Sequence, residues 1–213
     1  MARDPIRELV RVGEETVQRI REACKGASVQ PIPYSEPTKV RGLWRVIADL
    51  PAERQLKAVQ LHAADFDTPA LFHRLCTVAI EAGAYDAERG RWFAMLAVES
   101  LEPLVGRLDD GLMLNLFARA HAVVGNALRR LGRLEEADRA FGMAFRTLEE
   151  AGDAAHPVVV AEFFLYAACF EIERDNFRMA AVHLEEGLKL WRGIITKLTE
   201  QQQAAEAAEN AAG

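Results

Sequence analysis

Apolar residues recur at steps of three and four along most of this chain, a spacing that puts them on one face of an α-helix. A clear series is Val40, Leu43, Trp44 and Ile47. The sustained apolar and polar alternation that is typical of strands is absent, and the valine run 158–160 leads straight into a stretch of helical length. The pattern therefore predicts an all-α fold.

Residues that start, turn or end helices punctuate the chain between these apolar faces. They are Pro51, Thr68, Pro69, Gly83, Asp109, Asp110, Gly132, Gly152, Pro157, Asp175 and Asn176. Either Asp109 or Asp110 is expected to cap the helix that follows it. The spacing predicts two short helices before about residue 64, followed by three helical hairpins.

The same features divide the chain into four parts. Residues 1–25 form an amphipathic helix, because their apolar residues lie on one stripe and the other faces are charged. Residues 26–38, GASVQPIPYSEPT, contain three prolines and no periodicity, which is typical of a linker. Residues 39–199 hold the helical hairpins, and residues 200–213 are expected to be a flexible tail rich in Ala, Gln and Glu.

The segment AHAVVGNALRRLGRLEEADRAFGMAF, residues 120–145, has small residues where two helices would cross and large ones beside them. Gly125, Ala137 and Ala144 are the small positions, Gly132 lies in the turn and Phe141 fills the seam. In these positions the segment resembles a tetratricopeptide repeat. The resemblance implies a right-handed superhelical stack of antiparallel helical hairpins, here with a separate N-terminal helix.

Both neighbouring hairpins share parts of this pattern. In the third hairpin the pattern recurs, except that Asp175 replaces the turn glycine. In the first hairpin Val78 falls at the small crossing position, and only Gly90 and two later alanines match. Successive units are longer than the about 34 residues of a standard repeat, so their helices must be extended.

In this family the first helices of the hairpins line a concave face that usually holds a partner's peptide. The resemblance assigns to that face Arg119, Asn126, Arg129, Arg130, Glu162, Leu165 and Cys169. Steps of seven and three keep Arg119, Asn126 and Arg129 near one line, and Arg with Asn suits a carboxylate, so an acidic or C-terminal peptide is the expected ligand. The alternative is a solvated face on which these arginines pair with Glu135 and Glu136.

Two apolar stripes near the chain ends need a surface to cover them. They comprise Ile6, Val10, Val17 and Ile20 in the first helix, and Trp191 and Ile195 in the last. In one explanation the first helix caps an open end of the stack, as solenoids require of their termini. In the other, the terminal helices form a homodimer or dock on another protein.

The charge distribution restricts the partners. The formal net charge of −6 divides into +3 for residues 1–47 and −9 for the remainder. Because an acidic body repels phosphate backbones, we do not expect nucleic-acid binding. No apolar run approaches the about 20 residues of a membrane-spanning helix, and the N-terminus lacks the apolar core of a secretory signal, so we expect no membrane association.

Residues with catalytic or ligating chemistry are scattered. Cys24, Cys76 and Cys169 are odd in number and form no CxxC pair, which favours a reducing cytoplasm. His73 and Cys76 share a helical face and could be half of a metal site, but without a second pair a core role is expected. Phosphate loops, nucleophile elbows and zinc-protease helices are absent, so we expect no enzyme activity, metal or cofactor.

These observations lead to a bacterial, cytoplasmic, non-catalytic adaptor or scaffold that binds a peptide or helix of another protein through its concave face. An alternative is a sensor or regulatory subunit of a bacterial signalling or transcription-control system. DNA binding by the chain itself is disfavoured, because the 13-residue linker is far longer than the turn of a helix-turn-helix.

Overall fold

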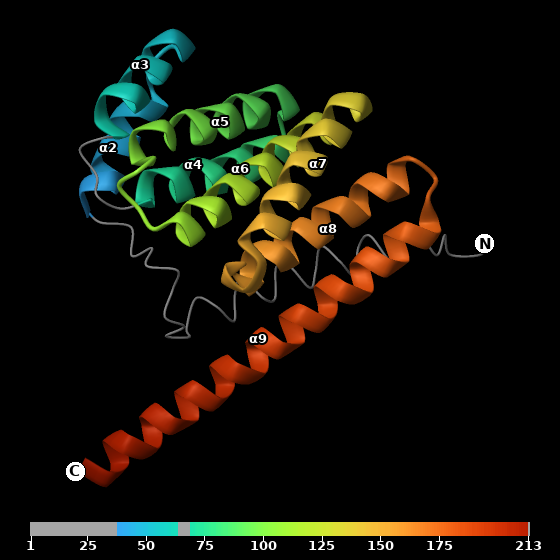
Figure 1. Ribbon diagram of the computed structural model, residues 1–213. Coiled ribbons are helices and arrows are strands. Elements are labelled where there is room, and N and C mark those ends of the chain that lie inside the picture. The colour runs from blue at the N-terminus through green and yellow to red at the C-terminus, as the bar shows by residue number, and fades with distance from the viewer. Residues whose placement is uncertain (1–37, 64–68, 213) are drawn as a thin grey trace.

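The computed structural model describes residues 38–63 and 69–212 (Figure 1). Its helices are α2 (Thr38–Ala48), α3 (Ala52–Ala63), α4 (Ala70–Gly83), α5 (Ala87–Glu99), α6 (Asp110–Arg130), α7 (Leu134–Ala151), α8 (Pro157–Glu173) and α9 (Phe177–Ala212), with short 3₁₀ turns at Glu102–Leu104 and Gly152–Ala154. No strand occurs in these ranges, so the all-α prediction is confirmed for them. The predicted N-terminal helix with its stripe Ile6, Val10, Val17 and Ile20, and nearly all of the linker, lie outside the described residues.

Two predicted helix starts, at Asp109 and Pro157, have side-chain caps. Asp109, rather than Asp110, accepts a hydrogen bond from the Leu112 N–H at 3.2 Å and caps α6. His156 accepts one from Val158 at 3.3 Å, with Pro157 in the first turn of α8. Because the first N–H groups of a helix have no partner within it, these bonds define where α6 and α8 begin.

The turns of the second and third hairpins share one backbone conformation. Gly132 (φ 69°) and Asp175 (φ 59°) both lie in the left-handed region. In each turn the next N–H donates to the carbonyl five residues earlier, at 3.0 Å from Arg133 and 2.9 Å from Asn176, which is the Schellman motif. Since Asp is among the few residues that adopt this conformation readily, replacing the turn glycine at 175 preserves the geometry.

Small residues lie where the paired helices approach each other closely. A Cβ on Gly90 of α5 would lie 2.5 Å from the Gly83 Cα and 2.9 Å from the Ala79 carbonyl oxygen of α4. The prediction that Val78 occupies this crossing is therefore wrong, because the helices meet at Ala79 and Gly83. In the second hairpin a Cβ on Gly125 would lie 3.0 Å from the Phe141 ring.

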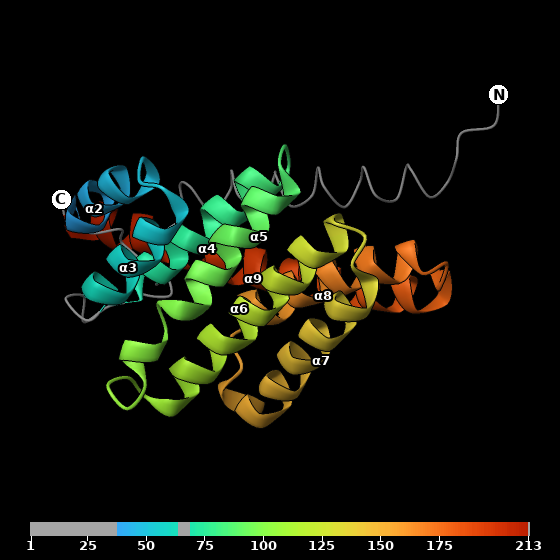
Figure 2. The same ribbon diagram turned by 90° about the horizontal axis from the view of Figure 1, so that it is seen from above.

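The helices pack as hairpins α4–α5, α6–α7 and α8–α9, with α4, α6 and α8 side by side (Figures 1 and 2). Helices α2 and α3 cover the end of this arrangement formed by α4 and α5. The largest apolar cluster joins α2 to α6, and a second joins α6, α7 and α8. Helix α7 contacts α8 much less extensively than α5 contacts α6, so the packing is open on that side.

Helix α9 extends far past α8 (Figure 1). Its first half packs on α8, where Trp191 contacts the cluster containing Ala161 and Leu165. The sequence predicts a flexible tail from residue 200, whereas the structure continues the helix to Ala212. Ala, Gln and Glu favour helix even without packing, and Gln202 adds a hydrogen bond to Glu206 at 3.1 Å. None of the described helices is both long and apolar enough to cross a bilayer.

Candidate functional site

The arginine that sequence analysis assigned to the concave face takes part in an ion pair between helices. Arg119 of α6 donates from Nε to Oε2 of Glu162 at 2.8 Å and from Nη2 to Oε1 at 3.1 Å, and its Nη1 contacts Nδ1 of His73 on α4. Burial alone would lower the pKa of Arg119, but the charge of Glu162 raises it above its usual value. Arg119 therefore links α4, α6 and α8.

The other predicted arginines also have partners within the chain. Arg129 donates to Oδ1 of buried Asn126 at 3.1 and 3.0 Å and forms an ion pair with Glu173 of α8. Arg130 donates to the Gly83 carbonyl at 2.9 Å. The structure does not show the alternative pairing of Arg119 and Arg129 with Glu135 and Glu136. Arg133 pairs with Glu136 instead.

The remaining predicted site residues are divided between the core and the surface. Leu165 is buried against Trp191, and Cys169 is half-buried. Ile195 is 39% exposed, although it shares the predicted stripe with Trp191. Helix α8 therefore covers only part of the C-terminal stripe.

His73 and Cys76 are both buried on α4. Burial, and secondly the charge of Arg119, lowers the pKa of His73 well below its usual range. Burial raises the pKa of the Cys76 thiol to about 12, so the thiolate that acts as nucleophile or ligand is disfavoured. Within residues 38–63 and 69–212, no three His, Cys, Asp or Glu side chains form a group that could hold a metal ion.

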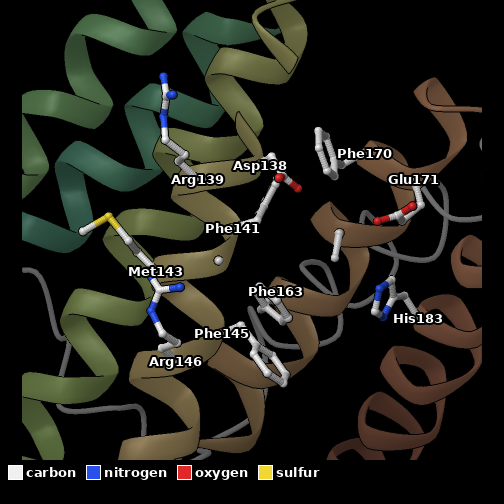
Figure 3. Close-up of a pocket in the computed structure, with 12 residues that line it drawn as sticks. Asp138, Arg139, Phe141, Met143, Phe145, Arg146, Phe163, Phe170, Glu171 and His183 are labelled. Atoms are coloured by element: carbon white, nitrogen blue, oxygen red, sulfur yellow. The ribbon is translucent and has the colours of Figure 1, made fainter. Parts of the chain in front are cut away.

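An open cavity of about 550 Å³ lies where α7 and α8 diverge (Figure 3), and we refer to it as the α7–α9 groove. Helix α7 contributes Asp138, Arg139, Gly142, Met143, Phe145 and Arg146. Helix α8 contributes Phe163, Phe170 and Glu171, and α9 contributes His183. Such size and lining are typical of a site that receives side chains of a ligand.

Aromatic rings cover much of the groove. Phe145 lies 6.1 Å from Phe163, and Phe163 continues through Phe164 at 5.6 Å to His183 at 5.7 Å, all between ring centroids. Burial lowers the pKa of His183, so its ring is favoured in the neutral form. Phe145 is 46% exposed and Met143 is 43% exposed. The groove therefore presents aromatic and sulfur-containing surface to the solvent.

The charged residues around the groove differ in whether they form ion pairs or hydrogen bonds within the chain. Asp138 forms an ion pair with Arg174 at 3.1 Å, and Glu171 accepts a hydrogen bond from Asn176 at 2.6 Å. Arg139 and Arg146 are exposed and form no hydrogen bond or ion pair with another described residue. Figure 3 shows both arginines leaving α7 on the side of Met143, whereas Asp138 and Phe145 lie toward α8. Glu171 keeps its negative charge, since Asn176 is a neutral donor, and the charge of Arg139 also acts on nearby Glu136. Arg139 and Arg146 are thus the lining cations whose N–H groups have no acceptor within the described residues.

The apolar pattern of the sequence does not predict this groove. One signal was available: Met143 and Phe145 are large apolar residues next to, but outside, the stripe of Phe141, Ala144 and Leu148 that faces the core. Comparison of the chain with family models, with curated proteins and with solved structures gives no match. The assignment of a site therefore depends on the geometry alone.

Proposed function

We propose that the chain is a non-catalytic interaction protein, similar to tetratricopeptide-repeat scaffolds, whose α7–α9 groove binds a helix of a partner protein. The observation that carries the proposal is the exposed apolar surface of Phe145, which lies beside the Phe163 ring in the groove, with Met143 exposed on the other flank of α7. Exposed apolar surface next to a cavity marks interaction sites. This surface replaces the α6 face as the binding surface, because Arg119 and Arg129 already have partners inside the chain.

The likeness to the repeat family has support in the internal geometry. The second and third hairpins share the Schellman turn at Gly132 and Asp175. Small residues occur at close approaches in all three hairpins, at Gly90, Gly125 and Gly187. Repeated units of this kind stack their hydrophobic faces and leave elongated surfaces for partners.

The groove is formed by helices alone, and this favours a helix as its ligand. Helices α7, α8 and α9 use their backbone N–H and C=O groups internally, so an extended peptide would find few backbone partners in the groove. A partner helix satisfies its own backbone and needs only side-chain contacts. A second copy of this chain is disfavoured, since two facing grooves would leave both unfilled and bring Arg139 and Arg146 against like charges.

The test is photo-crosslinking in the cell that produces the protein. A photoreactive amino acid replaces Met143 in the groove or, as the control, Leu61 of α3, which is 70% exposed outside the groove. We expect a discrete heterologous adduct from position 143, mapped by mass spectrometry to a helical segment, and none from position 61. Equal labelling from both positions, or adducts with a second copy of this chain only, would refute the proposal.

A further inference from the structure

We infer that the partner helix carries acidic residues along the flank that faces α7 and a small residue where it passes Gly142. This inference rests on the proposed function and adds the chemistry of the partner. Its basis is the pair of exposed arginines, Arg139 and Arg146, placed on either side of a glycine that nothing inside the chain requires.

The two arginines are a local exception to the charge of the chain. The protein has a formal net charge of −6, yet at this groove Asp138 is paired with Arg174 and Glu171 already accepts a hydrogen bond from Asn176, whereas the guanidinium groups of Arg139 and Arg146 have no acceptor within the described residues. Arg139 and Arg146 are seven residues apart, or about 10.5 Å along the axis of α7. Carboxylates two turns apart on a partner helix match that spacing, and a guanidinium binds a carboxylate with two parallel hydrogen bonds.

Gly142 provides a second, independent observation. A Cβ there would meet only the end of the Arg146 side chain, 3.6 Å away, whereas Gly90 and Gly125 would collide with the paired helix. Glycine within a helix costs about 1 kcal/mol relative to alanine, and the packing of α7 does not explain that cost. Its missing side chain leaves a depression in which the backbone of a partner helix can approach closely.

A single-stranded nucleic acid is the competing occupant, because it too combines stacking on aromatic rings with contacts to arginine. The observations favour the acidic helix. Phosphates recur at every nucleotide, so a strand that contacts Arg139 and Arg146 would also bring phosphates against Asp138 and Glu171 in the same groove. A helix brings its carboxylates to one flank only and keeps its apolar residues toward Phe145 and Phe163.

The experiment is a selection of 18-residue peptides from a random display library on the purified full chain. Gly142→Leu serves as the counter-selection, since a Cβ there meets only the end of Arg146 and the longer side chain would occupy the space left for the partner. Gly42→Leu is the control, because Gly42 is a helical glycine whose Cβ would likewise meet no backbone or core atom, and it lies exposed in α2 outside the groove. We expect enriched peptides with apolar residues at helical spacing and excess Asp and Glu, retained on Gly42→Leu and lost on Gly142→Leu.

The outcomes separate this inference from the proposed function. Helical peptides that are neutral or basic, yet lost on Gly142→Leu, would overturn the acidic partner and leave the groove function standing. A selection in which no peptide depends on position 142 would overturn both. Displacement of the selected peptide by a single-stranded oligonucleotide at equal concentration would assign the groove to nucleic acid instead.

The arginines themselves are tested on the enriched peptide by fluorescence anisotropy. The double variant Arg139→Glu/Arg146→Glu should raise Kd on the order of tenfold or more and reverse its dependence on salt, because salt then screens a repulsion instead of an attraction. The variant Lys189→Glu/Arg192→Glu makes the same change in net charge at exposed positions of α9 outside the groove, and it should change Kd less than about twofold. Equal losses in the two variants would overturn a local role for Arg139 and Arg146.

Discussion

Glu162 of α8 holds the guanidinium of Arg119 of α6 at two points, Oε2 to Nε at 2.8 Å and Oε1 to Nη2 at 3.1 Å. The two side chains are only 14% and 19% exposed, so the pair is largely removed from water. Two parallel bonds fix the relative position of the helices more narrowly than one bond would. The pair thus sets how the second hairpin meets the third.

This pair should be strongly coupled in stability. Arg119→Met leaves the Glu162 carboxylate without its partner and should lower the free energy of unfolding by about 3–5 kcal/mol. The double variant Arg119→Met/Glu162→Leu removes both charges and should recover most of that loss. Urea unfolding at pH 7.5 of the four proteins in the double-mutant cycle measures the coupling. Additive losses would mean that the ion pair does not hold the helices together.

Gly90 and Gly142 should respond in opposite directions to the same substitution. Gly90→Ala forces a Cβ to within 2.5 Å of the Gly83 backbone and should lower the free energy of unfolding by about 1–3 kcal/mol. Gly142→Ala meets nothing but a flexible arginine end and should raise it by up to about 1 kcal/mol. Thermal unfolding followed by circular dichroism compares them. A destabilising Gly142→Ala would show that α7 itself needs glycine there.

The helical architecture was predictable because its determinants are local in sequence. Steps of three and four define the apolar faces, and Asp109, Pro157 and Gly132 start or end helices by interactions within a few residues. Val78 was misplaced because the crossing of α4 and α5 depends on where α4 ends, at Gly83, and the close contacts lie at Ala79 and Gly83. The apolar pattern does not indicate the helix that continues through the tail to Ala212, because this helix depends on intrinsic propensity rather than on an apolar face.

The groove was not predictable from the same information. Whether Arg119 faces a ligand or a neighbour depends on Glu162, which lies 43 residues further along the chain, and on the alignment of two hairpins. The open space between α7 and α8 likewise depends on the angle between the two hairpins, and Phe145 would be an ordinary core residue if they packed closely. Sequence periodicity describes the faces of single helices, not the angles between them.

Two buried asparagines of α6 should tolerate replacement by aspartate very differently. Asn115 donates to the carbonyl oxygens of Gly111 and Ala154, at 2.7 and 2.8 Å, and accepts from the His156 N–H at 2.6 Å. Asn115→Asp loses both donors and sets a carboxylate against two carbonyls, so the free energy of unfolding should fall by about 1–3 kcal/mol or more.

Asn126→Asp is the matched control for that change. The Asn126 oxygen accepts both of its hydrogen bonds from Arg129, and a carboxylate can accept the same two with added charge attraction. We expect a loss less than half that of Asn115→Asp in urea unfolding at pH 7.5. Equal losses would indicate that burial of a carboxylate, rather than the missing donors, determines the result.

The stability of the protein should fall as the solution becomes mildly acidic. Burial lowers the pKa of His73 well below its usual range, with a further contribution from Arg119, and burial also lowers the pKa of His121. As the pH falls through about 6.5, the unfolded chain therefore takes up protons that the folded chain does not, and the free energy of unfolding decreases. Above that pH both states are neutral at these residues and the effect vanishes.

His73→Gln isolates the largest contribution, because glutamine does not titrate and its oxygen can still accept a hydrogen bond from Arg119. Between pH 7.5 and 5 the free energy of unfolding of this variant should decrease less than that of the parent, while at pH 7.5 it should remain close to the parent value or below it. His121→Gln, at a less buried site, should flatten the profile by a smaller amount. Urea unfolding over this pH range measures how the free energy of unfolding of each variant depends on pH. Carboxylate titration contributes equally to variant and parent, so it cancels in the comparison. A His73→Gln profile parallel to that of the parent would show that His73 titrates alike in the folded and unfolded chains.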